Sequence, residues 1–454
     1  MRNLYQQPFF RGLLCAFACI ASPLAAQPAT EVLQNAEQAL SAGNPARTVE
    51  LTQTLLLQNT DDFTALYLLS LARSDLGQDE AAAQVATSAY GAALNDAERL
   101  QAARLIGGAR FRLGHYTRAQ WWLRIAANYA TTPQDTATVA REFQQIQRTN
   151  PLSAQANLNI APTDNINNGA DSDLLSLDGI DIEFRLPPET MALSGIEYAG
   201  DLQLSYRISQ NTRQITSVDA FAYARSYTLS AASENSVLGL KGSDYALVLA
   251  EVALTQRRFL IDGFGLTTVS GGGGHVQFSG EPLWNYTKFT LGQEFAAGPD
   301  AVLSVQASVQ NQTARNDIVP NTKVYNLTTS YAVQRPNGDR FQLSLVGILN
   351  DAEIDESTFS DISGSINYSF ARPILSINWS MTAGIGHTNF DEFSLSLDGR
   401  RDDYITVGGT GVLSDPSYFG FSPSITVTAT KRQSNVDPFN STQIQARIGI
   451  QSNF

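Results

Sequence analysis

The C-terminal segment constrains the fold of this chain more than any other. From residue 443 to residue 454 apolar and polar side chains alternate, and the apolar face carries Ile444, Ala446, Ile448, Ile450 and Phe454. A period of two predicts a β-strand with one polar face. A strand of this kind that ends on an aromatic residue is typical of outer-membrane β-barrels, whose side chains alternately face lipid and a polar lumen. We therefore interpret Ile448, Ile450 and Phe454 as a C-terminal barrel-assembly signal.

The same alternation recurs through the rest of the C-terminal region. It is clearest over residues 152–160, 194–208, 361–370 and 375–385. Many segments exceed the ~5–6 residues of an average strand and match the ~9–11 residues of a tilted transmembrane strand. Their polar faces are rich in Ser, Thr, Asn and Gln, as in a wet lumen. We predict a transmembrane antiparallel β-barrel of about 14 strands over residues 151–454. The run Gly271–Gly274 predicts either a kinked strand or a bulged one.

The connections between strands alternate in length. Short turns are predicted at 297–300, 335–338, 371–374 and 414–417. Longer polar loops are predicted at 312–321, 350–356, 387–402 and 431–440. Short turns on the periplasmic rim and longer loops on the other rim are the usual arrangement in outer-membrane barrels.

The first 26 residues have the pattern of a secretory signal. Arg2 and Arg11 accompany an apolar core that is shorter than the ~20 residues of a spanning helix, and small residues precede Gln27. Both cysteines of the chain, Cys15 and Cys19, lie in this segment. The mature protein is therefore expected to contain no disulfide and no thiolate metal site.

The charge balance argues against a nucleic-acid partner. Removal of the signal leaves 28 basic and 43 acidic residues, a net charge of −15. Binding to phosphates needs a basic patch. Nucleic acid is therefore excluded as a partner.

Residues 27–150 predict a helical repeat domain. Gly43, Gly77 and Gly114 each mark a turn between helices, and the first two are 34 residues apart, the period of tetratricopeptide repeats. Small residues recur where paired helices must approach closely, as at Gly107. Such a stack binds segments of other proteins. The adjacent Trp121 and Trp122 are expected in packing contacts, and His115 is expected to be an exposed turn residue.

Residues with catalytic potential are scarce. The chain has three histidines, and none has a metal-binding spacing. His275 with Ser270 or Ser279 is a weak candidate for a lipase-like pair, because no residue that would orient the histidine is evident. Asp164, Asp171 and Asp173 are interpreted as solvated loop carboxylates rather than a calcium site. We expect no cofactor, no metal and no enzymatic activity.

Three segments resemble the surface lipoprotein assembly modifier (Slam) family. The Asp-Asn-rich segment from Ala161 to Gly169 is similar to the start of that family's barrel. The segment Gly399 to Asp403 is similar to its Arg-Arg-Asp element, and Ser434-Asn435 with the last strand is similar to its closing segment. The departure is a short helical domain whose first repeat is degenerate.

The resemblance implies an outer-membrane translocator that exports surface lipoproteins or related clients. The helical domain would lie in the periplasm and bind the client or its chaperone, and the barrel would form or help form the passage. The C-terminal signal makes the barrel-assembly machinery a further candidate partner. The alternatives are a polysaccharide exporter and a passive porin with a docking domain. The candidate lumen or gate residues are those of the first loop: Asp164, Asn165, Asn167, Asn168 and Gly169.

Overall fold

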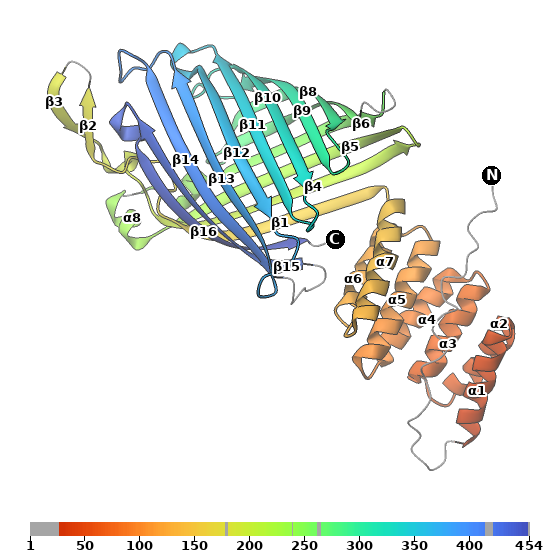
Figure 1. Cartoon of the computed structure of the whole chain (residues 1–454). Coiled ribbons are helices and arrows are strands. Elements are labelled where there is room, and N and C mark those ends of the chain that lie inside the picture. The colour runs from red at the N-terminus through yellow and green to blue at the C-terminus, as the bar shows by residue number, and fades with distance from the viewer. Residues whose placement is uncertain (1–26, 178–179, 238, 261–264, 414–420, 453–454) are drawn as a thin grey trace. The chain divides into compact units, whose positions relative to one another are not determined.

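The computed structural model describes residues 27–177, 180–237, 239–260, 265–413 and 421–452. The chain forms two compact units that divide between Ile146 and Gln147 (Figure 1). The signal segment, the predicted turn at 414–417 and Phe454 lie outside the described residues. Among the described residues, no helix is long and apolar enough to span a membrane.

The described N-terminal region consists of helices that pack in sequence order. They are α1 (Gln27–Ser41), α2 (Pro45–Leu56), α3 (Phe63–Asp75), α4 (Asp79–Ala92), α5 (Asp96–Arg112), α6 (Tyr116–Ala127) and α7 (Pro133–Thr149). Gly43, Gly77 and Gly114 have φ values of 76°, 72° and 77°, which a glycine adopts without steric cost, and each ends the first helix of a pair. The tetratricopeptide-like pairing predicted from these glycines is confirmed.

Small buried residues let the helices approach closely. Ala82, Ala86 and Ala89 of α4 are fully buried. At Gly107 of α5, a Cβ atom would lie 3.2 Å from Leu123 of α6, so a larger residue would push these helices apart. Trp122 packs edge-on against Tyr90, as expected for a packing residue. Trp121 is half exposed, so only part of its surface can pack; His115 is exposed as predicted.

An ion pair joins α5 to α7. Arg104 and Glu142 meet through two hydrogen bonds of 3.0 and 2.5 Å, and their side chains are only 8% and 13% exposed. Around it, Val139, Phe143 and Ile146 of α7 pack against α5 and α6. The apolar contacts and the ion pair together fix α7 to the repeats.

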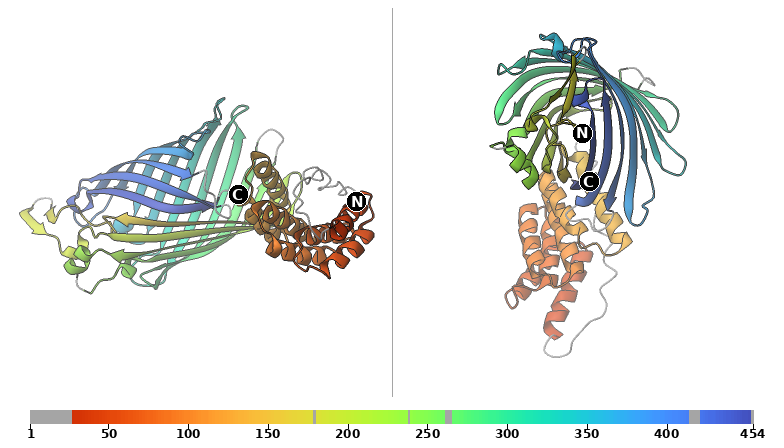
Figure 2. Two further views of the ribbon diagram at one scale, coloured as in Figure 1. Left: turned by 90° about the horizontal axis from the view of Figure 1, so that it is seen from below. Right: turned by 90° about the vertical axis from the view of Figure 1, so that its left-hand side faces the viewer.

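The C-terminal unit is a closed barrel of 14 antiparallel strands, as predicted (Figure 2). The strands are β1 (Leu152–Thr163), β4 (Gly195–Gln210), β5 (Gln214–Leu229), β6 (Leu247–Arg258), β7 (Thr267–Phe278), β8 (Glu281–Ala296), β9 (Ala301–Ala314), β10 (Thr322–Gln334), β11 (Arg340–Ala352), β12 (Phe359–Ser369), β13 (Ile377–Phe390), β14 (Arg400–Leu413), β15 (Phe421–Ser434) and β16 (Ser441–Ser452). Neighbours in sequence are neighbours in the barrel, and β1 closes it by pairing with both β4 and β16.

The two rims of the barrel differ. The near rim, where β1 begins and β16 ends, carries the connections 211–213, 259–266, 297–300, 335–339 and 370–376. The far rim carries 164–194 and 230–246, the longest connections, together with 279–280, 315–321, 353–358, 391–399 and 435–440. The predicted short turns at 297–300, 335–338 and 371–374 share the near rim, as predicted, whereas the shortest connection, 279–280, lies on the far rim. The predicted long loops share the other but are shorter than expected, because their flanking residues continue the strands.

The far rim also carries the small elements of the barrel unit. The hairpin of β2 (Leu174–Leu177) and β3 (Ile180–Arg185) and the short helix α8 (Ala231–Ser236) lie at this end (Figure 1). The tight turn at Ser279-Gly280 has φ values of 55° and 81°, as a two-residue hairpin loop requires. The glycine run Gly271–Gly274 lies within β7 and is paired on both sides, and the bulge follows it at Val276.

Candidate functional site

The outer face of the barrel is apolar. Ile362, Ile385 and Ile448 are each about two thirds exposed, and many other large apolar side chains point outward from the strands. Exposing so many apolar side chains to water would be unfavourable, whereas contact with the hydrocarbon of a membrane is favourable. Ile450, on the same face as Ile448, is also exposed. The outward side chains of the last strand are therefore placed as lipid-facing residues.

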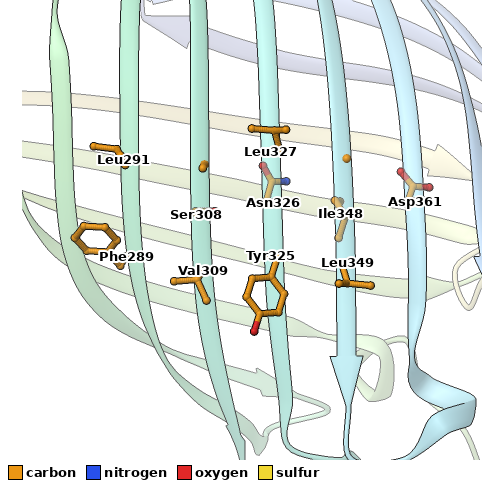
Figure 3. Close-up of a pocket in the computed structure, with 12 residues that line it drawn as sticks. Phe289, Leu291, Ser308, Val309, Tyr325, Asn326, Leu327, Ile348, Leu349 and Asp361 are labelled. Atoms are coloured by element: carbon orange, nitrogen blue, oxygen red, sulfur yellow. The ribbon is translucent and has the colours of Figure 1, made fainter.

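One apolar depression lies on this outer face across β8 to β11 (Figure 3). Its volume is about 610 Å³, and it is flanked by Phe289, Leu291, Val309, Tyr325, Leu327 and Leu349. The wall recedes at Ala307 and Gly347, which have little or no side chain. Because the side chains that flank it are mainly apolar, the depression suits a hydrocarbon chain.

The inner face is polar and has two kinds of wall. Strands β9 to β13 present mainly hydroxyls and amides: the hydroxyls of Ser304 and Ser330 are 2.7 Å apart, and Asn367 donates to Thr382. Strands β4, β5, β6, β8 and β16 carry charges that lie near one another in pairs of opposite sign. These pairs are Lys288 with Glu251, Arg257 with Asp219, and Arg447 with Glu197. A hydrated chain can pass such a wall without meeting a large field of one sign.

Two tyrosines lie across glycines on the inner face. A Cβ atom on Gly274 would collide with the ring of Tyr286, and one on Gly386 would collide with the ring of Tyr404. The Tyr286 hydroxyl donates to Glu251 at 2.8 Å, next to Lys288. The glycine run predicted as a kink or bulge therefore makes room for an aromatic ring that fixes a lumenal carboxylate.

The first-loop segment predicted as a gate element is folded onto the far rim. Asn165 is buried, and its amide and carbonyl groups bond to the backbone of Gly169 at 2.8 and 2.7 Å. Asn167 donates to the carbonyl oxygens of Glu189 and Met191 and accepts from the N–H of Leu193. Asn168 takes a φ of 51°, which asparagine tolerates better than most residues. Hydrogen bonds or backbone conformation thus explain why asparagine occupies each of these three positions.

A buried apolar cluster anchors the first-loop segment to the barrel. Ile166, Leu193, Tyr227 and Val237 are buried together, and they join the first loop to β5 and to the connection at 230–246. Asp164 and Asn165 line a cavity of about 390 Å³ beside Asp171 and Thr442. The segment therefore borders an open space at the barrel closure rather than hanging free in solvent.

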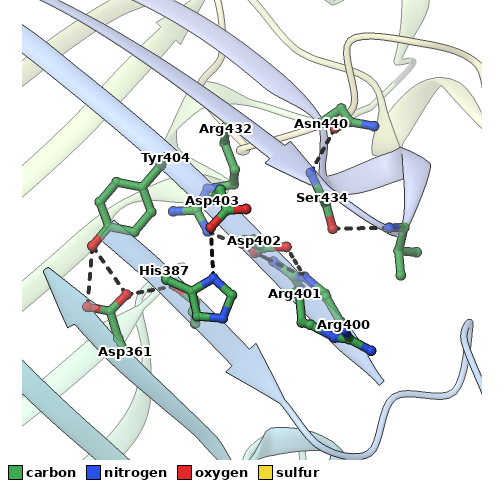
Figure 4. A network of polar contacts seen from close by, with 12 residues as sticks. Asp361, His387, Arg400, Arg401, Asp402, Asp403, Tyr404, Arg432, Ser434 and Asn440 are labelled. Atoms are coloured by element: carbon green, nitrogen blue, oxygen red, sulfur yellow. Dashed lines mark hydrogen bonds and ion pairs between the residues drawn. The ribbon is translucent and has the colours of Figure 1, made fainter. Parts of the chain in front are cut away.

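An arginine at the start of β14 is caged by aromatic rings. The Arg400 guanidinium lies 3.4 Å from the ring centre of Phe439 and 4.7 and 5.3 Å from those of Phe390 and Phe393. It bonds twice to Asp402, which is fully buried and also accepts from Arg432 (Figure 4). Cation–π contacts and a shared carboxylate hold the connections 391–399 and 435–440 together at the mouth.

The three segments that carry the family resemblance meet at the far rim. Asn435 accepts from the N–H of Arg401 at 2.6 Å and donates to the carbonyl oxygen of Gly399 at 2.9 Å. Asp171, just after the Asp-Asn segment, accepts from the N–H of Thr442 at 2.7 Å. Sequence spacing alone does not reveal this meeting, because the segments are far apart in the chain.

The weak catalytic candidates do not form a site. Ser270 shares a hydrogen bond with Thr255 on the inner face, whereas His275 contacts Asn285 on the outer face. Among the described residues no group of three or more His, Cys, Asp or Glu could hold a metal ion. Asp171 bonds to β16 and Asp173 lies 3.8 Å from Arg185, so these two carboxylates have structural partners.

The helical unit carries an aromatic cluster between its later repeats. The hydroxyls of Tyr90 and Tyr129 are 3.0 Å apart, and Trp122 packs on Tyr90. Burial, together with the bond to Tyr129, raises the pKa of Tyr90 to about 12. Tyr90 is therefore a neutral phenol that supports packing and does not ionise near neutral pH.

These features define a membrane-spanning β-barrel with a polar lumen, joined in one chain to tetratricopeptide-like helices. No family model matches the chain, and no curated protein shows significant similarity to it. The helical part is similar to the Yersinia enterocolitica type III secretion translocator chaperone SycD, with 14% identity, a TM-score of 0.26, and coverage of 28% of this chain and 88% of that one.

The barrel is similar to two solved structures. Acinetobacter baumannii OccAB4 matches with 10% identity, a TM-score of 0.31, and coverage of 66% of this chain and 97% of that one. A bacterial polysaccharide outer membrane secretin matches with 10% identity, a TM-score of 0.34, and coverage of 66% and 98%. At these values the similarities carry no conclusion about function.

Proposed function

We propose that this protein is an outer-membrane translocator that helps export surface lipoproteins or related client proteins. The observation that carries the proposal is the union, in one chain, of helical repeats and a polar-lined barrel with an apolar exterior. The three Slam-like segments, from Ala161 to Gly169, from Gly399 to Asp403, and Ser434-Asn435, support it because their residues build the far-rim mouth.

Each part has a role in this proposal. The helical domain, residues 27–150, lies in the periplasm and binds the client or its chaperone, as tetratricopeptide stacks bind protein segments. The barrel, residues 151–454, provides the passage, and its paired charges and hydroxyl wall keep a hydrated polypeptide mobile. The barrel-assembly machinery recognises the last strand through Ile448, Ile450 and Phe454. The Asp-Asn segment of the first loop controls the mouth.

Reconstitution tests the proposal against its alternatives. The purified mature protein is placed in liposomes together with candidate lipoproteins of its host, and protease is added outside. Exposure of a lipoprotein that depends on the protein supports export. Leakage of small solutes without such exposure indicates a porin, and selective passage of a polysaccharide indicates a polymer exporter. A comparison of liposomes that contain the Asn167→Ala variant with liposomes that contain the unmodified protein tests whether the first loop controls passage. This substitution changes no residue of the barrel strands.

A further inference from the structure

The barrel closure between β1 and β16 is much shorter than the other strand pairings. In the described residues this ladder runs only from Asn157 opposite Gln451 to Ile160 opposite Ile448. On its other side β1 pairs with β4 over its whole length, and β16 pairs with β15 over its whole length. Toward the far rim, the described residues 161–163 of β1 and 441–447 of β16 thus pair with β4 and β15 but not with one another.

Side chains replace the backbone ladder on the far-rim half of this seam. Gln443 of β16 reaches Thr163 and the carbonyl oxygen of Asn165 only at 3.5 and 3.4 Å. Gln445 donates to Glu197 of β4 at 3.4 Å, across β1, and Arg447 lies 3.6 Å from the same carboxylate. These contacts are long, and they exchange for water more easily than a paired backbone does.

The first loop closes the same half from the far rim. Asp171 takes the place of a β1 partner by accepting from the N–H of Thr442, and its own N–H lies 3.4 Å from the carbonyl oxygen of Asn440. The cavity of about 390 Å³ lies here, between the first loop and Thr442, and Met191 also lines it. At the far rim, the β1–β16 seam therefore ends at this cavity, which the first loop borders in place of a strand.

We propose that the β1–β16 seam opens sideways, so that the acyl chains of a lipid-anchored client pass from the lumen into the membrane. This inference rests on the proposed export function. A lipoprotein joins a hydrated polypeptide to hydrocarbon chains, and the lumen wall is polar and charged. The acyl chains gain a favourable environment only by crossing that wall, and an intact ladder blocks the crossing. Among the barrel pairings between described residues, this seam has the shortest backbone ladder, so it opens at the least cost.

A disulfide across the ladder tests this opening. Leu158 and Ile450 lie directly opposite one another and both face outward. Opposite Cα atoms in antiparallel strands are about 4.5–5.5 Å apart, which suits a disulfide. The variant Leu158→Cys/Ile450→Cys therefore locks the seam when oxidised. The matched control is Val427→Cys/Ala446→Cys, which joins β16 to β15 within a complete ladder.

The measurement uses full-length protein in its host. Acylated proteins are labelled with an alkyne-bearing palmitate, and those that external protease reaches in intact cells are identified. Cells without the gene define the clients as the acylated proteins that lose exposure. The inference predicts at least a tenfold loss of client exposure in the oxidised seam variant, recovery on reduction, and no change in the control. Heat-modifiable migration on gels verifies that each barrel is folded.

The outcomes separate the two proposals. Clients that disappear with the gene but remain exposed in the oxidised seam variant would overturn the lateral opening while leaving export intact. Acylated proteins that are unchanged when the gene is removed would overturn the export function, and the opening with it. A loss that reduction does not reverse would count against the opening, because the lock alone is then not the cause.

Discussion

The buried ion pair in the helical unit gives the most quantitative prediction. Glu142→Gln keeps the shape of the side chain and removes the negative charge that faces Arg104. The Arg104 side chain is only 8% exposed, so its guanidinium remains in a site where water replaces the lost carboxylate poorly. The free energy of unfolding of the helical unit should fall.

The size of the effect follows from burial and geometry. Removing one partner of a buried ion pair typically costs about 3–5 kcal/mol. Glutamine keeps one acceptor oxygen, and Glu142 is 13% exposed, so the lower end of about 3 kcal/mol applies here. For a unit of this size, that loss lowers the melting temperature by roughly 10 °C. The double variant Arg104→Met/Glu142→Leu removes both charges and should recover to within about 1 kcal/mol.

Thermal unfolding of the full-length protein in detergent, followed by circular dichroism at 222 nm, measures the effect because helices dominate this signal. The control is Glu50→Gln, which removes the partner of Arg47 in a pair whose side chains are 50% and 67% exposed. This exposed pair should contribute less than about 0.5 kcal/mol. If the two glutamine variants melt within 2 °C of one another, roughly the shift that 0.5 kcal/mol produces, the buried pair has no special role and the reasoning is wrong.

Three further predictions concern the barrel. Gly449→Ala places a Cβ atom 2.6 Å from the carbonyl oxygen of Leu158, so it should weaken the β1–β16 seam. The temperature at which the barrel unfolds on gels should therefore fall. The control Gly347→Ala, which has open space around its Cβ position, should leave this temperature unchanged. Arg400→Gln removes the cation from its aromatic cage, so the connections 391–399 and 435–440 should be cut faster by protease in intact cells, and equal cutting would contradict the cage. Asn167→Ala removes three hydrogen bonds of the first loop, so solute flux through liposomes should rise at least twofold, and unchanged flux would show that the loop does not limit passage.

Local patterns predicted much of the fold. The alternation of apolar and polar residues fixes which side chains face lipid, as at Ile444 and Ile448, because strand geometry is local. The helical turns followed from single glycines for the same reason. Loop lengths were less predictable: Phe390 and Arg400 continue the strands past the expected loop boundaries, because pairing with a neighbouring strand outweighs their polar surroundings.

The mouth of the barrel could not be predicted in the same way. The aromatic cage of Arg400 needs Phe390 and Phe393 from one part of the chain and Phe439 from another, and only the barrel topology brings them together. The degree of burial was also not predictable, since Trp121 was expected in packing contacts and lies half exposed. A short seam also leaves no signal in sequence, because β1 and β16 alternate as regularly as strands with complete ladders.

The most direct test of the account is cysteine accessibility along one strand of the barrel in lipid. Single cysteines at Gly364, Ser365, Ile366 and Asn367 of β12 are treated with a membrane-impermeant, water-soluble thiol reagent; the native cysteines, Cys15 and Cys19, both precede the mature chain that we propose. A wet lumen inside a lipid-facing wall predicts strong labelling at 365 and 367 and little at 364 and 366. Equal labelling at all four positions would contradict the alternation on which the passage depends.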